Sequence, residues 1–500
     1  MPSHEASDEN DPAGRLPGLA ERVRGAVIWR SGSQVVAQII TWAATFLVIR
    51  LLDPADYGMF AMTGVVLVFL NLMNGYGFTS ALVQTESIDR QRIAQVFGIL
   101  LILNGALATA QILLAPLAAA YFRQPMIEDM LRVQALLYAS TPFIALPHAL
   151  LSREIEFKRQ AKINLVSAVL SAAAAVGCAA AGAGVWTLVI APIVLFWSRA
   201  VGLTLAARWL VWPSFRFAGA GRLFSYGGTM VAIQFFWFLQ SQSDVFIAGR
   251  LLDPHRLGLY TTALFLTQIL AAKFVPPLNE VAFAAYSRMQ ADRDMMAGAF
   301  VKAARLIMLV TLPFYFGLAV TVEPLVLTFL GPKWAGIVAI VPTLALAMPF
   351  LTLQILFAPA TNALGRPGIA LGTGVAGAAI LPTAFLIGIG HGLAGLAYAW
   401  LGGMALLTLA TVALSAPAIA LNLGELLRAL RPGFLASAAM AAGVLALDSA
   451  LPAMPPQPRL AILVAAGAAL YGGLLLAFAR PLVAEAVELI RGRRGEPAAA

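Results

Sequence analysis

Long apolar runs, separated by short polar or Gly/Pro-containing breaks, are the dominant pattern of this chain. Each run is long enough to cross the hydrocarbon core of a bilayer, which takes about 20 predominantly apolar residues in a helix. Fourteen such runs have centres near Ile39, Val66, Ala106, Ala139, Leu170, Ile193, Phe238, Gln268, Val310, Leu346, Ala376, Tyr398, Ala442 and Ala469. The pattern predicts an all-α integral membrane protein with about 14 transmembrane helices.

Two repeated phrases divide these helices into blocks. "RLLDPADYGMF" (Arg50–Phe60) returns as "RLLDPHRLGLY" (Arg250–Tyr260) in the turn after the seventh run. A second pair, Phe122–Phe143 and Phe329–Phe350, has equal length, Pro at the fourth position and Pro-Phe at the end. We therefore predict two homologous blocks of six helices. Because six is even, both blocks have the same orientation, as in parallel transporter repeats.

These repeats predict the following organisation. Residues 1–25 form a cytoplasmic tail, residues 26–210 a first lobe of six spans, and residues 211–225 a cytoplasmic linker. Residues 226–415 form a second lobe of six spans. Residues 416–480 add two spans, and residues 481–500 form a second cytoplasmic tail. In the repeated phrase, Asp-Pro is expected to make the turn between consecutive spans, with Gly opening the returning helix.

Composition and charge agree with this class. Sixty per cent of the residues are hydrophobic, 11 % are charged, and the mean hydropathy is +0.84. Soluble domains carry about 25 % charged residues. With fourteen spans and a cytoplasmic N-terminus, 24 of the 33 Lys and Arg residues lie on the inner side, seven on the outer side and two within spans. This asymmetry follows the positive-inside rule, so the net charge of +9 reports orientation and not a nucleic-acid partner.

The chain offers little for enzymatic chemistry. A single cysteine, Cys178, excludes an intramolecular disulfide and argues against a cysteine-built metal site. The Gly372–Gly377 match to Gly-x-Gly-x-x-Gly lies in an apolar run, where small residues serve helix packing. His148 and His391 are isolated in the sequence, and the loops are short. We therefore predict a protein that is not an enzyme, with no catalytic residues, cofactor or metal.

Ionisable residues inside the predicted spans are the main candidates for a binding site, because each is costly in the membrane unless paired or hydrated. They are Arg199, Asp244, Lys273 and Glu280. Helical rise separates Asp244 from Lys273 by about 13 Å in depth, so a direct ion pair is not expected. Three polar candidates for a hydrated cavity accompany them: Gln234, Gln38 and Asn74.

Three stretches resemble a known family. Val48–Gln84, Ser243–Tyr260 ("SDVFIAGRLLDPHRLGLY") and Glu323–Trp334 ("EPLVLTFLGPKW") are similar to polysaccharide-export or Wzx-type flippases of the multidrug/oligosaccharidyl-lipid/polysaccharide superfamily. The resemblance runs from about residue 25 to 415. It implies translocation of a polyprenyl-diphosphate-linked oligosaccharide across the bacterial inner membrane for surface or extracellular polysaccharide biosynthesis. Transport would proceed by alternating access between the two lobes.

The resemblance also implies roles and partners. Arg199 and Lys273 would contact the diphosphate, and Asp244 and Glu280 would tune the cavity or couple an ion, H⁺ or Na⁺. Asp244 matches an acidic position of the family, but Val245 follows it where the family often has Asn. The implied partners are the lipid-linked oligosaccharide, membrane lipids and a polysaccharide polymerase or export machinery.

Two other functions remain open at this point. An ion-coupled multidrug or metabolite antiporter of the same superfamily would often carry an acidic residue inside the first lobe, and the first five spans contain none. A membrane-embedded polysaccharide polymerase would be expected to carry a larger extramembrane loop with clustered Arg, His or acidic residues.

Overall fold

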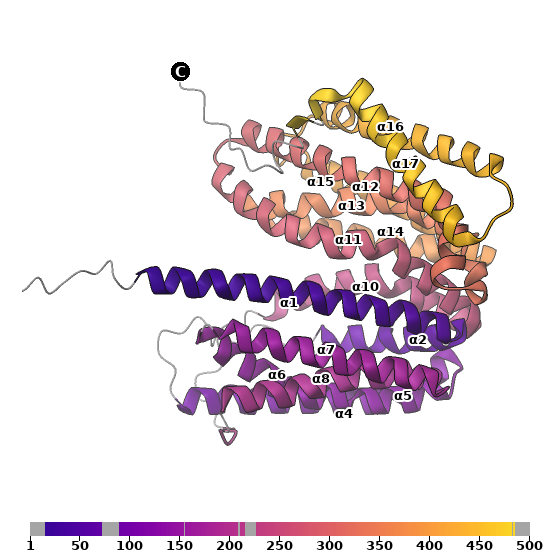
Figure 1. Cartoon of the computed structure of the whole chain (residues 1–500). Helices are drawn as coiled ribbons and strands as arrows, with labels where there is room; N and C mark the ends of the chain where they lie inside the picture. The colour runs from indigo at the N-terminus through magenta and orange to yellow at the C-terminus, as the bar shows by residue number, and fades with distance from the viewer. Residues whose placement is uncertain are drawn as a thin grey trace, which may run out of the picture. The chain divides into compact units, whose positions relative to one another are not determined.

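The computed structural model describes residues 16–72, 90–154, 156–208, 211–215, 227–482 and 484–485. In the helices that begin at residues 16 and 227, side chains are described from residues 32 and 234 onward. Its regular elements are all helical (Figure 1). The first half contains α1 (Leu16–Leu51), α2 (Pro54–Asn71), α4 (Arg90–Phe122), α5 (Met126–Gln134), α6 (Leu136–Arg153), α7 (Phe157–Ala180) and α8 (Trp186–Ala207). The second half contains α10 (Gly227–Leu251), α11 (Pro254–Met289), α12 (Arg293–Phe329), η2 (Pro332–Ile337), α13 (Val341–Ala363), α14 (Pro367–Gly388), η3 (Ile389–His391), α15 (Gly392–Ser415), α16 (Leu423–Ala450) and α17 (Pro456–Phe478).

The predicted all-α membrane fold is confirmed, and all fourteen predicted span centres lie within helices. Among the described residues, twelve helical segments are long and apolar enough to cross a membrane. One of them, Pro367–Ser415, contains both α14 and α15, and α10 is not among the twelve. Helix α10 carries Gln234, Gln240, Gln242 and Asp244, which lower its apolar character. The number fourteen is therefore approximate.

Contacts divide the described helices into two compact units. Unit 1 contains α1 and α4–α8, and unit 2 contains α2 and α10–α17. The division after α8 lies close to the predicted linker at residues 211–225, but α2 belongs to unit 2 although we predicted it within the first lobe, residues 26–210. Contacts report packing and not repeat membership, so the two lobes of six helices stay a prediction.

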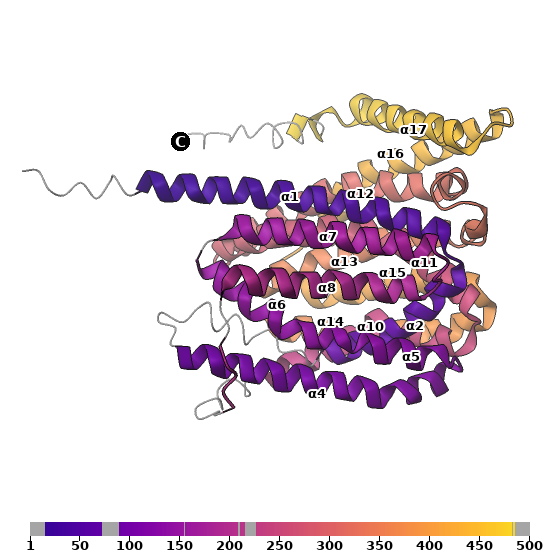
Figure 2. The same cartoon turned by 60° about the horizontal axis from the view of Figure 1, so that its bottom comes forward.

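Unit 1 is a bundle in which α7 packs against α1 and α8, and α6 packs against α8 and α4. Figure 2 shows α7 alongside both α1 and α8. Apolar side chains close the interior between α4 and α6, where Ile93, Leu100, Leu146 and Leu150 form a buried cluster. Gln111 of α4 donates a 2.6 Å hydrogen bond to the Leu131 carbonyl, which joins α5 to the bundle. These contacts position α6, α7 and α8 around the site described below.

Unit 2 is organised around α11, α12 and α13, which pack on one another. Helices α16 and α17 both lie on α12 (Figure 1). Ion pairs join them at two levels: Arg459 contacts Glu323 of α12 at 3.2 Å and Asp448 of α16 at 2.7 Å. Beyond the end of α17, Glu485 pairs with Arg305 of α12 and, at 2.9 Å, with Lys302. The two additional helices are thus fixed to α12.

Both copies of the first repeated phrase form a turn between helices, as predicted. Helices α1 and α10 end at the first Leu after Arg (Leu51 and Leu251), and α2 and α11 begin at Pro54 and Pro254. Asp253 caps α11 by accepting a 3.0 Å hydrogen bond from the Arg256 backbone N–H. In the first copy, the Asp56 carboxylate accepts a 3.1 Å bond from the Asp53 backbone N–H. These bonds satisfy donors that a helix N-terminus leaves open.

The glycine of the phrase has a different purpose from the one expected. Helices α2 and α11 pack directly against each other. A Cβ atom at Gly58 would lie 1.9 Å from the carbonyl oxygen of Pro254, and one at Gly258 would lie 1.6 Å from that of Pro54. Each copy therefore places its glycine on the proline of the other copy. Only a residue without a side chain permits this approach.

The second repeat and the glycine-rich stretch also have clear structural counterparts. Phe122–Phe143 contains the short helix α5 and the start of α6, while Phe329–Phe350 contains η2 and the start of α13. Gly372–Gly377 lies within α14, as expected for a packing motif. There the Gln240 side chain of α10 donates a 3.0 Å hydrogen bond to the Gly374 carbonyl, and a Cβ at Gly377 would lie 2.1 Å from its Nε2. The glycines admit an interhelical hydrogen bond.

We predict that Gly258→Ala destabilises the protein, because ordinary van der Waals contact begins near 3.4 Å and the opposing atom is backbone. Overpacking of this kind costs about 1–3 kcal/mol. Thermal unfolding of the detergent-purified protein measures the effect. Gly64→Ala on α2, where a Cβ would meet nothing within 4 Å, is the matched control and should leave the unfolding temperature unchanged or higher. Equal unfolding temperatures for the two variants would contradict the close approach.

Candidate functional site

A polar pocket of about 360 Å³ lies within unit 1, between α1, α6, α7 and α8. Its walls come from the middle of α1, the end of α6, the first half of α7 and the middle of α8. The lining residues are Ser33, Gln34, Ala37, Gln38, Thr41, His148, Phe157, Gln160, Ala161, Asn164, Ala168, Leu195 and Arg199.

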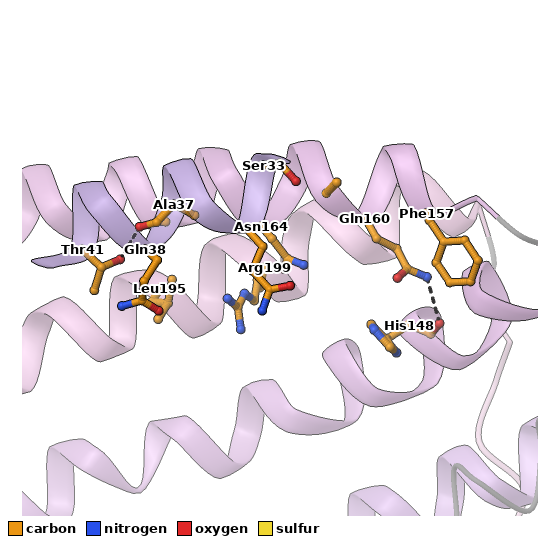
Figure 3. A pocket seen from close by; sticks show the side chains of 13 residues that line it. Ser33, Ala37, Gln38, Thr41, His148, Phe157, Gln160, Asn164, Leu195 and Arg199 are labelled. Atoms are coloured by element: carbon orange, nitrogen blue, oxygen red, sulfur yellow. Dashed lines mark hydrogen bonds between the residues drawn. The ribbon is translucent and has the colours of Figure 1, made fainter. Parts of the chain in front are cut away.

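The chemistry of the lining is unusual for the interior of an apolar bundle. Carboxamide side chains come from two neighbouring helices, Gln34 and Gln38 on α1 and Gln160 and Asn164 on α7. Figure 3 shows Asn164 beside Arg199 and Gln38 beside Leu195 in the pocket. The lining residues include no Asp or Glu. A carboxamide both donates and accepts hydrogen bonds, so the pocket suits a hydroxyl-rich or anionic guest.

Arg199 is the charged residue of this pocket, and its charge is not balanced within the described residues. The side chain is half-buried and makes no ion pair there, and its Nε is buried without a hydrogen-bond partner. Arg199 lies nine residues before Arg208, the residue that caps α8, hence about 13 Å from the end of the helix. An unpaired guanidinium at that depth is costly, and a bound anion would offset the cost.

Neighbouring contacts hold the α6–α7 side of the pocket in place. Gln160 Nε2 donates to the His148 carbonyl at 3.3 Å (Figure 3). It also donates to the Ser152 hydroxyl at 3.0 Å. The α7 side chain is thereby oriented by α6. Across α7, the Ser171 hydroxyl donates to the Ala191 carbonyl of α8 at 2.8 Å. Helices α6 and α8 are thus both hydrogen-bonded to α7.

A family model described as "Polysaccharide biosynthesis protein" matches residues 47–339, more than half of the chain. The chain belongs to this polysaccharide biosynthesis protein family. The resemblance noted from the repeated phrases is therefore confirmed at the level of the family.

Relatives of this family member include two curated bacterial proteins. The "Succinoglycan biosynthesis transport protein ExoT" of Rhizobium meliloti (strain 1021) is 26 % identical over 346 residues, 68 % of this chain and 69 % of that protein. The "Teichuronic acid biosynthesis protein TuaB" of Bacillus subtilis (strain 168) is 23 % identical over 480 residues, 92 % of this chain and 96 % of that protein.

Solved structures share the fold. "Lipid II flippase MurJ, inward closed conformation" superimposes with a TM-score of 0.72 at 13 % identity, over 91 % of this chain and 100 % of that one. A "multidrug resistance MATE family transporter of the MOP superfamily" gives a TM-score of 0.55 at 13 % identity, over 84 % and 98 %. The polysaccharide biosynthesis protein therefore has the fold of this transporter superfamily.

The structure brings two of the predicted site residues, Arg199 and Gln38, into one pocket. Sequence reasoning overlooked Gln160 and Asn164 and treated His148 as isolated. Their spacing was informative: Gln160 and Asn164 are one helical turn apart, as are Gln34 and Gln38, so each pair lies on one helix face. Asn74 lies outside the described residues.

The other predicted site residues belong to unit 2. Lys273 and Glu280 are exposed on α11, and Gln234 is partly buried on α10. Neither Lys273 nor Glu280 makes an ion pair with a residue that the structure describes. Their assignment to a substrate cavity stays a prediction.

Asp244 has a different environment. Its side chain is 2 % exposed. Oδ2 accepts a 2.9 Å hydrogen bond from the Tyr260 hydroxyl, which accepts a 2.6 Å bond from the Trp400 indole N–H. Oδ1 accepts a 2.7 Å bond from the Val245 backbone N–H. Among the described residues, these partners engage both oxygens of Asp244, and no ion pair joins it to Lys273. The hydrogen-bond chain joins α10, α11 and α15.

We predict that Tyr260→Phe destabilises this polysaccharide biosynthesis protein, because Asp244 and the Trp400 indole would each lose their shared partner in a buried site. Leaving buried polar groups unsatisfied costs about 1–3 kcal/mol. Tyr398→Phe, on an exposed side chain of α15, is the matched control. Thermal unfolding in detergent measures both variants. An unchanged unfolding temperature for Tyr260→Phe would show that the chain of hydrogen bonds does not stabilise the fold.

Proposed function

We propose that the protein translocates a polyprenyl-diphosphate-linked oligosaccharide across the bacterial inner membrane for surface or extracellular polysaccharide biosynthesis. Membership of the polysaccharide biosynthesis protein family supports this proposal. So does the likeness to proteins named for succinoglycan transport and teichuronic acid biosynthesis. The observation that carries it is Arg199, a cation with no counter-ion among the described residues, in a pocket lined by carboxamides.

The substrate's chemistry matches this pocket in two respects. A guanidinium forms strong charge-assisted hydrogen bonds with phosphate oxygens, so Arg199 would hold the diphosphate. Gln34, Gln38, Gln160 and Asn164 would exchange hydrogen bonds with sugar hydroxyls and replace part of their water. The polyprenyl tail can stay in hydrocarbon, because only the polar head needs a path through it.

Residues of the second unit complete the proposed mechanism. Lys273 would be a further phosphate contact, and access would alternate between the two sides as in transporters built from parallel repeats. Asp244 is engaged by Tyr260 and Val245, which favours a structural role for it. Glu280, exposed on α11, then remains the candidate for coupling an ion, H⁺ or Na⁺. The charge asymmetry supports cytoplasmic termini.

An antiporter for drugs or metabolites is the second candidate, because the fold is shared with a MATE family transporter. The unit 1 pocket disfavours cationic drugs, since its lining contains a cation and no acid. Deletion of the gene separates the two functions. Accumulation of lipid-linked oligosaccharide on the cytoplasmic leaflet supports the flippase, whereas normal polysaccharide export with altered drug resistance would reject it.

We predict that Arg199→Gln reduces translocation of a fluorescent lipid-linked oligosaccharide in proteoliposomes at least tenfold, because it removes the charge that holds the diphosphate. Arg199→Lys should retain part of the activity. The matched control is Arg132→Gln, which removes one exposed charge from α5 of the same unit. Size-exclusion profiles verify that each variant is folded. Wild-type translocation by folded Arg199→Gln protein would eliminate this assignment.

A parallel prediction concerns unit 2: Lys273→Ala reduces polysaccharide export in a deletion strain without loss of folded protein. The physical reason is the loss of a proposed phosphate contact. Lys162→Ala, which removes an exposed lysine of α7 outside the pocket lining, is the control. Export is measured as surface polysaccharide per cell at matched expression. If Lys273→Ala and the control export equally well, Lys273 is not a substrate contact.

A further inference from the structure

A second cavity of unit 1, an apolar groove of about 280 Å³, takes no part in the function proposed above. It lies between α4, α6, α8 and the segment at residues 211–213. Its apolar lining residues include Phe97, Leu101, Phe143, Leu146 and Val211. Helix α6 contributes to both cavities, with His148 in the polar pocket and Phe143 and Leu146 in the groove.

The wall of the groove at residues 211–213 is held in place, because this segment is attached to the bundle. The Ser214 backbone N–H donates a 2.8 Å hydrogen bond to the Ala94 carbonyl of α4. A Cβ at Gly98 would lie 2.3 Å from the Ser214 carbonyl oxygen, so glycine is needed for the segment to lie this close. The segment at residues 211–215 therefore lies on the start of α4.

The interior of the groove offers almost no hydrogen-bonding group. Thr204 is the one hydroxyl of its lining, and its Oγ1 already donates to the Phe143 carbonyl at 3.2 Å. Trp212 is the other polar lining side chain, and it is 90 % exposed. Tryptophan is typical of the boundary between hydrocarbon and water. A sugar or a peptide backbone would lose its hydrogen bonds in this groove, whereas a hydrocarbon chain would not.

Two arginines lie at one end of the helices that line this groove. Arg90 precedes Phe97 by seven residues and Leu101 by eleven, so it lies on the groove-lining face of α4, at its first turn. Arg208 caps α8 one turn after Thr204. Both arginines are exposed. The Ser214–Ala94 bond joins the chain that follows α8 to the start of α4, which puts the two cations at one end of the unit.

We propose that this groove binds one anionic glycerophospholipid, with an acyl chain along Phe97 and Leu101 and the phosphate between Arg90 and Arg208. An apolar channel with cations at one end matches an anionic amphiphile in shape and charge, as basic sites between membrane helices do for anionic lipids. The phosphate position also distinguishes this lipid from the transported one. Arg199 lies nine residues before Arg208, about 13 Å from it along the axis of α8. A lipid phosphate held at Arg208 would therefore not reach the polar pocket.

The test is native mass spectrometry of the detergent-purified full chain titrated with dioleoyl phosphatidylglycerol, and with dioleoyl phosphatidylcholine as the zwitterionic comparison. We expect one saturable phosphatidylglycerol site, bound at least tenfold more tightly than phosphatidylcholine. The double variant Arg90→Gln/Arg208→Gln should abolish that preference. Leu101→Trp, which fills the groove without changing the charge, should remove the saturable site.

The matched control is Arg92→Gln/Arg159→Gln. It removes the same charge from the same end of unit 1, but Arg92 lies about 200° around α4 from Arg90 and α7 does not line the groove. This control should bind phosphatidylglycerol as the unaltered chain does. Equal losses in both double variants, or binding that never saturates, would mean annular lipid only and overturn the proposal.

Competition with undecaprenyl phosphate identifies the source of the lipid. We expect it to leave the phosphatidylglycerol site occupied. If undecaprenyl phosphate instead occupies the site at a tenfold lower concentration than phosphatidylglycerol needs, the groove binds the lipid carrier and the proposed occupant is wrong. Translocation by the Arg199 variants does not enter this measurement, so either proposal can fail without the other.

Discussion

The direct contact between α2 and α11 is the constraint on which unit 2 depends. Gly58 and Gly258 admit the prolyl carbonyls of the opposite helix, so the two copies of one phrase form a nearly symmetric crossing. Tyr260 follows Gly258 by two residues and reaches Asp244 and Trp400 from there. On the α2 side, Asp53 pairs with Lys333 at 3.0 Å, and Tyr57 packs edge-on against Trp334. The close approach of the two backbones thus positions side-chain contacts with three other elements, α10, α15 and η2.

Two ionisable side chains within the helices of this protein have opposite surroundings, and the contrast is the basis for the different roles that we propose for them. Asp244 has partners for both of its oxygens in the described structure. Arg199 has a buried Nε with none. In a low-dielectric interior, a satisfied carboxylate cross-links helices, whereas an unsatisfied guanidinium retains its attraction for an anion. The sequence shows both only as charges within apolar runs.

The hydropathy pattern and the repeated phrases were sufficient to predict the helices, the turns at Asp53 and Asp253, and the family. They could not predict that α2 packs with α11, because a membrane helix is apolar all round and its pattern does not identify its partner. Only part of the pocket lining could be predicted from the sequence, for a related reason. Arg199 and Gln38 stood out as polar residues in apolar runs, but Gln160 and Asn164 lie near the basic start of α7 and resemble an ordinary helix end. Their shared cavity depends on how α1, α7 and α8 pack.

The ion pairs of Arg459 and Glu485 have a mechanical consequence. They attach α16 and α17 to α12 at widely separated points along its length, near Glu323 and near Lys302. Between these points, Met440, Val444 and Leu463 are buried against Phe316 and Val320. These contacts couple α16 and α17 to α12, so a displacement of α12 is expected to move all three helices together. A chain shortened after α15 would not lose a detachable appendage; it would leave one side of α12 uncovered.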